Sequence, residues 1–372
     1  MKAKLHLLLV IFLMQFYSCE KKTANSIDDV PSDTLSTETR DPYRWPFSKG
    51  SIWNMPIGSN AVYVAANIKP ATRAGMTIDE DYIIMTPNEP LLDIYQSNVG
   101  WGSGDRCVKT GDLMCSLPIP KSFVVNRNTW DGNTPNAGIA VLMPDGQTIK
   151  QNQPFAYDPK YGYATTGYLF PDENLYGTGM YGAHGGSGLS AIGGALRYDE
   201  LTPTSGPIRH ALKVNLYGKE SIYYDSETQG YRWPAKTADG DADGSYSRDI
   251  TLKACRMGAL LALHKDLKIE SLQLETEPAR ILAKAFQDYG AYLVDNTGWS
   301  VYAIITEWGP GGRFKDKFKE NWGFDFITSV DSPFGRDMEK IFKNLYVIDN
   351  NSVSSVGGGG KPRQPYAPAF KK

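Results

Sequence analysis

Short apolar runs separated by Gly, Pro and Asn make up the chain from residue 41 to about residue 224. Examples are AVYVAANI (61–68), YIIMT (82–86), SFVVN (122–126), GIAVLM (138–143) and ALKVNLY (211–217). Runs of this length, rich in β-branched side chains and bounded by turn residues, predict β-strands. Their regular spacing predicts a mainly β body of the β-sandwich or jelly-roll type.

Helical patterns are confined to the last third of the chain. Residues 276–278 (Thr-Glu-Pro) combine an N-cap residue, an acid and a proline, and they predict a helix over 279–289 that ends before Gly290. A second short helix is predicted over 335–344. The run MGALLAL (257–263) fits a strand or a helix, and the β-rich sequence around it favours a strand.

The N-terminus has the pattern of a bacterial lipoprotein signal. A short basic start precedes mostly apolar residues 5–16, and a small residue then stands before Cys19. The apolar run is too short to span a bilayer but suits a signal peptide over residues 1–18. The segment resembles a lipobox, which implies that Cys19 carries the acyl chains. The alternative is an ordinary cleaved signal in which Cys19 has no role.

The domain organisation follows from composition. Residues 19–40 are polar and predict a disordered tether, residues 41–350 predict a single β-rich globular domain, and residues 351–372 form a Gly- and Pro-rich tail. Net charge is −2 and no stretch is basic, which disfavours nucleic acid as a partner. The absence of P-loop, Rossmann, CxxC and HExxH motifs disfavours zinc, nucleotide and redox-cofactor chemistry.

Several phrases together resemble a family of exported bacterial proteins that is found also in soil actinobacteria. The most specific are SIWNMPI (51–57), HGGSGLSAIGGALRYDEL (184–201), YGAYLVDNTG (289–298) and GGGGKPRQPYAP (357–368). The resemblance covers nearly the whole mature domain and implies export and a single secreted domain. It implies no activity, so function has to be inferred from the residues.

The most unusual segment is the glycine-rich loop over residues 176–188, in which His184 is the only histidine. Six glycines in thirteen residues let the backbone bend sharply and approach a ligand closely, and a histidine there can act as a base near neutral pH. Ser187 lacks the last glycine of a G-x-S-x-G nucleophile elbow, because Leu189 occupies that position. The alternative is a tight sheet corner with His184 hydrogen-bonded to backbone.

Three further residues are candidates for acid–base catalysis: Glu200, His210 and Asp295. A carboxylate pair with a histidine suits a glycoside hydrolase. A polysaccharide lyase needs a base and a cation that neutralises a uronate. Candidate substrate-binding residues for either reaction are Tyr181, Arg197, Arg209 and Tyr292. Each acid alternatively forms a structural salt bridge.

Two further sites concern stability. The alternating acids Asp239, Asp241 and Asp243, followed by Gly244, resemble part of an EF-hand loop and predict a structural calcium ion, with a solvated acidic turn as the alternative. Cys107 and Cys115 flank a polar loop and predict a small disulfide, which leaves Cys255 as a buried thiol.

These patterns predict a lipoprotein anchored in the cell envelope, with the outer membrane as the expected location. Export, the β-rich body and an aromatic content of 12% favour a carbohydrate-active enzyme that cleaves a polysaccharide. A non-catalytic glycan- or envelope-binding lipoprotein is the alternative, and a structural or assembly protein is a third. Convergence of Glu200, His210 and Asp295 in a cleft lined by Tyr and Trp would favour the enzyme.

Overall fold

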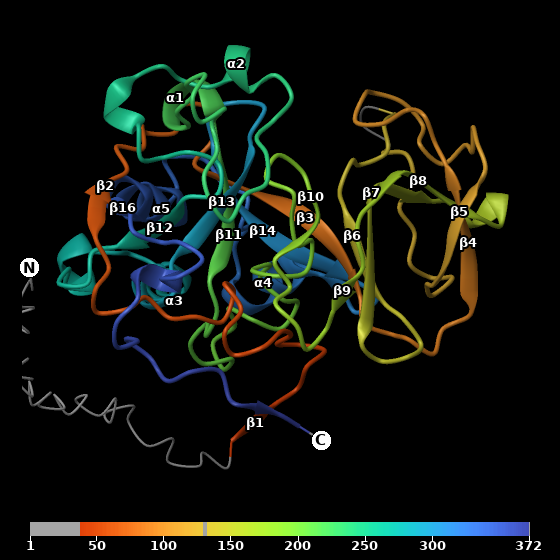
Figure 1. Ribbon diagram of the computed structural model, residues 1–372, viewed down its shortest axis with the longest axis horizontal. Helices are drawn as coiled ribbons and strands as arrows, with labels where there is room; N and C mark the ends of the chain where they lie inside the picture. The colour runs from red at the N-terminus through yellow and green to blue at the C-terminus, as the bar shows by residue number, and fades with distance from the viewer. Residues whose placement is uncertain (1–37, 129–131, 372) are drawn as a thin grey trace, which may run out of the picture. The chain divides into compact units, whose positions relative to one another are not determined.

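The chain folds around one large mixed β-sheet, seen in the computed structural model of Figure 1. The structure describes residues 38–128 and 132–371. The predicted signal peptide, the predicted lipidation site Cys19 and nearly all of the predicted tether lie outside these ranges. Within them, no helix is both long enough and apolar enough to cross a bilayer.

The strands in the described ranges are β1 Thr39–Arg40, β2 Tyr63–Ala65, β3 Met76–Ile84, β4 Leu91–Gln96, β5 Leu113–Pro118, β6 Ile139–Leu142, β7 Thr148–Tyr157, β8 Ala164–Leu169, β9 Glu173–Asn174, β10 Tyr181–His184, β11 Leu212–Leu216, β12 Leu260–Leu263, β13 Ala291–Asn296, β14 Tyr302–Gly309, β15 Gly312–Arg313, β16 Leu345–Ile348 and β17 Ala369–Phe370. The α-helices there are α1 Gly218–Ser221, α2 Ala242–Ser245, α3 Glu277–Asp288, α4 Phe314–Trp322 and α5 Pro333–Lys343.

The main sheet has the strand order β2-β16-β12-β13-β11-β14-β3-β6-β7-β8-β4-β5, with β15 and β9 paired to β14 and β7. Its central strands are mixed in direction. Strand β3 runs parallel to both β14 and β6, whereas β11 is parallel to β13 and antiparallel to β14. This arrangement brings segments near residues 80, 215, 295 and 305 side by side in the middle of the molecule.

The predicted fold class is confirmed. The described chain is mainly β, its helices are short and lie mostly in the C-terminal part, and the body is consistent with a β-sandwich. The two predicted helices correspond to α3 and α5, and the ambiguous run over residues 257–263 contains strand β12. Helix α4 was not predicted, although Phe314 and Phe318 are four residues apart and both are buried in it.

The central strands are covered on both faces. On one face, Val214, Leu293 and Ile304 belong to the apolar core that also holds Phe286 of α3 and Phe342 of α5. On the other face, Tyr292 and Ile305 belong to a second core with the buried Trp53. Because side chains alternate along a strand, each polar residue among these apolar ones must point into one of two dry layers.

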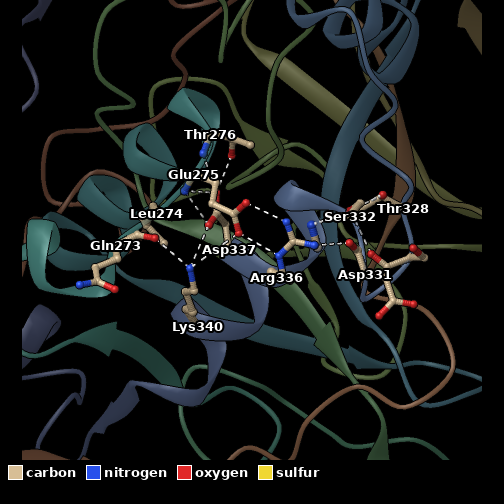
Figure 2. Close-up of polar contacts among 12 residues, drawn as sticks. Gln273, Leu274, Glu275, Thr276, Thr328, Asp331, Ser332, Arg336, Asp337 and Lys340 are labelled. Atoms are coloured by element: carbon tan, nitrogen blue, oxygen red, sulfur yellow. Dashed lines mark hydrogen bonds and ion pairs between the residues drawn. The ribbon is translucent and has the colours of Figure 1, made fainter.

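A carboxylate from α5 caps the start of α3 (Figure 2). Asp337, whose side chain is fully buried, accepts hydrogen bonds from the backbone N–H groups of Glu275 and Thr276 and from the Thr276 hydroxyl. Beside it, Arg336 of α5 forms a two-pronged ion pair with Glu275. The first N–H groups of a helix have no partner inside it, so this contact supplies one and joins the two helices.

The two ends of the described chain meet. Strand β1 pairs in parallel with β17, and the Arg40 guanidinium lies over the ring of Phe370. The predicted C-terminal tail contains this strand and a short 3-10 turn over Val356–Gly358, in which Gly357 and Gly358 are buried.

The predicted disulfide between Cys107 and Cys115 is not formed, and all three described cysteines are free thiols. The two candidate partners face different neighbours. The Cys107 thiol lies 3.6 Å from the carbonyl oxygen of Val125, whereas Cys115 lies within β5 opposite Ile94 of β4. Cys255 is a buried thiol, as expected.

Candidate active site

A cavity of about 710 Å³ opens beside the central strands, and its lining includes Asp79, Asp81, His184, Asn215 and Asp295. Each of these residues belongs to a strand. Asp79 and Asp81 come from β3, His184 ends β10, Asn215 lies in β11 and Asp295 lies near the end of β13. Residues from four strands therefore form one polar floor.

Alternation along β3 places Asp79 and Asp81 on the same face of the sheet. The same rule places Lys213 and Asn215 together on β11. Asn215 donates a hydrogen bond from Nδ2 to Asp79 Oδ2 at 2.9 Å, and Lys213 Nζ lies 2.5 Å from Asp81 Oδ2. Each acid of β3 therefore has a partner on β11, although β14 lies between these two strands.

His184 is held against Asp81. Its Nδ1 lies 3.0 and 3.1 Å from the two carboxylate oxygens of Asp81, and the histidine side chain is only 4% exposed. The sequence-based alternative, a histidine bonded to backbone, is not what the structure shows. The carboxylate fixes the ring orientation and leaves Nε2 as the nitrogen available to the cavity.

The glycine-rich loop makes room for these groups. Gly186 and Gly188 have φ of 61° and 66°, which lets the chain reverse immediately after His184. A Cβ atom on Gly185 or Gly186 would lie 2.8 or 2.7 Å from a carboxylate oxygen of Asp295. The glycines therefore allow the backbone to approach the acid, and Ser187 N–H closes the contact by donating to the Val294 carbonyl.

A β-bulge positions Asp295. Val214 of β11 pairs with Leu293, but the next residue, Asn215, pairs with Asp295, so Val294 is the extra residue in β13. Without the bulge, alternation would turn Asp295 away from the face that carries Asn215. The bulge instead places its carboxylate over the cavity floor, where the N–H of Asn296 donates to Oδ1 at 2.8 Å.

The acids of the cavity have opposite pKa shifts. Burial alone would raise the pKa of Asp81, but His184 and Lys213 outweigh burial and hold this pKa below its usual value. Burial raises the pKa of Asp79. Burial, with Asp239 and Asp79 close by, raises the pKa of Asp295 well above its ordinary value. The site therefore combines one firmly ionised acid with others that are hard to ionise.

Two buried polar atoms of the floor, Nε2 of His184 and Oδ1 of Asn215, have no hydrogen-bond partner among the residues that the structure describes. A buried polar atom that is left unpaired costs about 1–3 kcal/mol. Such atoms are uncommon in folded proteins, and in a cavity they indicate a position where a ligand can bind.

Asp79, His184 and Asp295 could also bind one metal ion together. Among the residues that the structure describes, they are the one group of acid, histidine or cysteine side chains whose ligand atoms lie close enough for this. One atom from each lies within 4.8 Å of the others. The predicted calcium loop does not form a comparable group. Asp239 accepts a hydrogen bond from the Tyr246 hydroxyl, whereas the exposed Asp241 accepts from Ser245, and α2 begins directly after Asp241.

Two of the four predicted catalytic residues, His184 and Asp295, meet in the cavity. The other two form a separate buried pair, in which Nε2 of His210 lies 3.1 Å from both carboxylate oxygens of Glu200. Neither residue of this pair is among the described residues that line the cavity. The expected convergence of Glu200, His210 and Asp295 is therefore not found.

The predicted substrate-binding residues also lie outside the described lining of the cavity. Arg197 is buried against Glu307, and Arg209 pairs with Glu38. Tyr292 is buried in an edge-to-face contact with Trp53, and Tyr181 carries the Lys236 ammonium over its ring. These side chains stabilise the fold around the cavity and do not face it.

Sequence reasoning did not select Asp79, Asp81, Lys213 and Asn215. A signal was present in β11, because this otherwise apolar strand carries two polar residues at positions i and i+2, whereas in β3 Glu80 between the two aspartates obscures the pattern. On a strand covered on both faces, such a pair has to find partners inside the protein.

Comparison of this chain with protein-family models, curated proteins and solved structures finds no match in any of the three. The geometry of the cavity is therefore the basis on which a function can be inferred.

Proposed function

We propose that this protein is an exported, lipid-anchored glycoside hydrolase that cleaves a neutral or positively charged polysaccharide in the cavity beside β3, β11 and β13. Hydrolysis of a glycosidic bond needs a group that activates water or attacks the sugar and a group that protonates the leaving oxygen. Carboxyl groups and an imidazole supply both functions, and the cavity floor has Asp79, His184 and Asp295 in contact range.

The observation that carries the choice of hydrolysis is the charge of the cavity. Its described lining includes four aspartates, Asp79, Asp81, Asp239 and Asp295, and neither lysine nor arginine. A polysaccharide lyase has to neutralise the carboxylate of a uronate, and the described lining offers no lysine or arginine that could do so. Lys213 cannot serve, because it is fully buried and already paired with Asp81.

Aromatic side chains at the cavity support a sugar ligand. Trp101 and Trp299 both line it and are 48% and 45% exposed. The ring of Trp101 also stacks on Tyr168, with centroids 4.7 Å apart and planes within 14°. An exposed indole with a fixed orientation offers the flat apolar face on which a sugar ring stacks.

The test is an assay for polysaccharide cleavage by the purified full-length protein. Neutral glucans, xylans and mannans, an amino-sugar polymer and uronate polymers are incubated with the wild type and with Asp295→Asn and Glu200→Gln variants. We expect new reducing ends from a neutral or amino-sugar polymer, a loss of at least about 100-fold in Asp295→Asn, and near-normal activity in Glu200→Gln. Glu200→Gln is the matched control because it changes a buried acid outside the cavity.

Three results would contradict the proposal. An unsaturated uronate product would show elimination in place of hydrolysis. Retention of a glycan without any product would show a binding protein, the alternative function. Loss of activity in Glu200→Gln, with activity kept in Asp295→Asn, would place the reaction at Glu200 and His210 and not in the cavity.

A further inference from the structure

Three strands bring potential metal ligands to one point of the cavity floor. Asp79 of β3, His184 of β10 and Asp295 of β13 each offer one ligand atom, and these atoms lie within 4.8 Å of one another. Ligand atoms that each lie about 2.0–2.2 Å from one ion are at most about 4.4 Å apart, so these three atoms would need to move together by no more than a few tenths of an ångström to share one. The three residues are separated by more than 100 positions in the chain, so the grouping is a property of the tertiary structure.

The imidazole of His184 supplies an observation independent of the acids. Its side chain is 96% buried, since only 4% is exposed, and its Nε2 has no hydrogen-bond partner. Because Nδ1 already contacts Asp81, Nε2 is the nitrogen left to face the other two ligands. A carboxylate behind a histidine in this way is the usual outer partner of a metal-bound imidazole, because it sets the orientation of the ring and strengthens the donor nitrogen.

The arrangement of acids around the floor also favours a bound cation. Asp81 is paired with Lys213, but Asp79 and Asp295 have no ion pair within the described chain. The Asn215 side chain donates a hydrogen bond to Asp79 and the Asn296 backbone donates one to Asp295, and Asp295 also shares a hydrogen bond with the side chain of Asp239. The described lining of the cavity contains no lysine or arginine. A divalent cation between the two carboxylates would therefore balance their negative charge.

We propose that Asp79, His184 and Asp295 bind one first-row divalent transition-metal ion, with Zn²⁺ preferred over Mn²⁺, and that Asp81 positions His184 for it. The imidazole decides the class of ion, because Ca²⁺ and Mg²⁺ take oxygen ligands whereas Zn²⁺ and Mn²⁺ accept mixed nitrogen and oxygen sets. Three protein ligands leave a coordination position open to the cavity, where a water molecule can bind.

The binding site does not depend on the proposed reaction, and only its catalytic role rests on that proposal. A metal ion at this point would polarise a bound water molecule and so make it a better nucleophile near neutral pH. In the hydrolysis proposed above, that water would attack the anomeric carbon and give up a proton to solvent. The bond to the leaving sugar oxygen would break as this oxygen takes the proton of Asp239, which lines the cavity without being one of the three ligands and is reprotonated from solvent.

The direct test measures metal binding without substrate. The full-length protein is stripped with a chelator, and binding of Zn²⁺, Mn²⁺ and Ca²⁺ is followed by titration calorimetry, with the visible absorption of bound Co²⁺ as a second readout. We expect one site per chain, tighter for Zn²⁺ than for Mn²⁺. His184→Gln and Asp295→Asn should abolish stoichiometric binding, and Asp81→Asn should weaken it by about 10–100-fold.

The control is Asp241→Asn, which changes an exposed acid of the turn before α2 and should leave binding unchanged. Circular dichroism of each stripped variant separates loss of a ligand from loss of the fold. The proposal is overturned if the folded wild type binds no ion with one-to-one stoichiometry, or if binding is lost in Asp241→Asn and kept in His184→Gln. Metal binding without cleavage of any glycan would instead overturn the proposed hydrolysis and leave the metal site standing.

Discussion

Replacement of Lys213 by methionine tests whether the buried charges beside the cavity hold the sheet together. The Lys213 side chain has no exposed surface, and its ammonium contacts Asp81 Oδ2 at 2.5 Å and the Ser190 carbonyl at 2.8 Å. Methionine preserves the apolar stem, so packing changes little. It removes the positive charge and leaves a buried carboxylate with His184 as its remaining side-chain partner.

The magnitude follows from these contacts. Breaking a buried ion pair by removing one partner costs about 3–5 kcal/mol, and the Ser190 carbonyl also loses its donor. We therefore expect the free energy of unfolding to fall by about 4 kcal/mol in Lys213→Met. Lys319→Met is the matched control, because Lys319 is 61% exposed and pairs with an equally exposed Asp325. Its loss should cost less than about 1 kcal/mol.

Urea unfolding of the purified protein at neutral pH, followed by tryptophan fluorescence, measures both variants. The double variant Asp81→Asn/Lys213→Met removes both charges, so it should lose less stability than the sum of the two single variants. A cost of less than about 1 kcal/mol for Lys213→Met, with an unchanged dependence on urea, would refute the reasoning.

Three further predictions concern parts of the molecule outside the cavity. The pKa of His210 is raised, because Glu200 outweighs the effect of burial, and the pKa of Glu200 is lowered by His210 against burial. The raised pKa of His210 stabilises the fold fully below pH 6.5, and the lowered pKa of Glu200 stabilises it fully above pH 4.5. Glu200→Gln should therefore lower the free energy of unfolding more at pH 5.5 than at pH 9. An equal loss at both pH values would contradict the pairing. Asp337→Ala should lower the free energy of unfolding by about 3 kcal/mol, because two backbone N–H groups at the start of α3 lose their hydrogen-bond acceptor. The matched surface change Asp325→Ala should have little effect, and thermal unfolding measures both variants. Cys19→Ala should move the protein from the membrane to the soluble fraction of cells, and continued membrane association would refute lipid anchoring.

The strand content and two helices could be predicted from local sequence, because their signals lie within each segment. Short β-branched runs between turn residues indicate strands wherever they pack. The start signals of α3 and α5 also lie within one helical turn, although only Ser332 of α5 forms a local cap, since the Thr276 hydroxyl bonds to Asp337. Helix α4 could also have been found from the spacing of Phe314 and Phe318. The large size of the sheet and its strand order depend on contacts between distant segments.

His184 and Asp295 could be selected as candidates because a glycine-rich loop and a strand end are visible in the sequence. Their partners could not be selected with the same ease. Asp81 is 103 residues from His184 and 132 residues from Lys213, and the pairing of β3, β14 and β11 brings them together. Glu200 and His210 were an equally reasonable choice from sequence, but their contact with each other satisfies both side chains away from the cavity.

The sequence by itself determined which segments form strands and helices, because hydrophobic periodicity and caps act over a few residues. It also indicated that polar residues on apolar strands need partners. Only the tertiary structure decided which partners they have. The clearest case is Asp295, which reaches the cavity floor because one extra residue, Val294, shifts the pairing between β13 and β11. Side chains alternate with a period of two, so a shift of one residue decides which face an acid occupies.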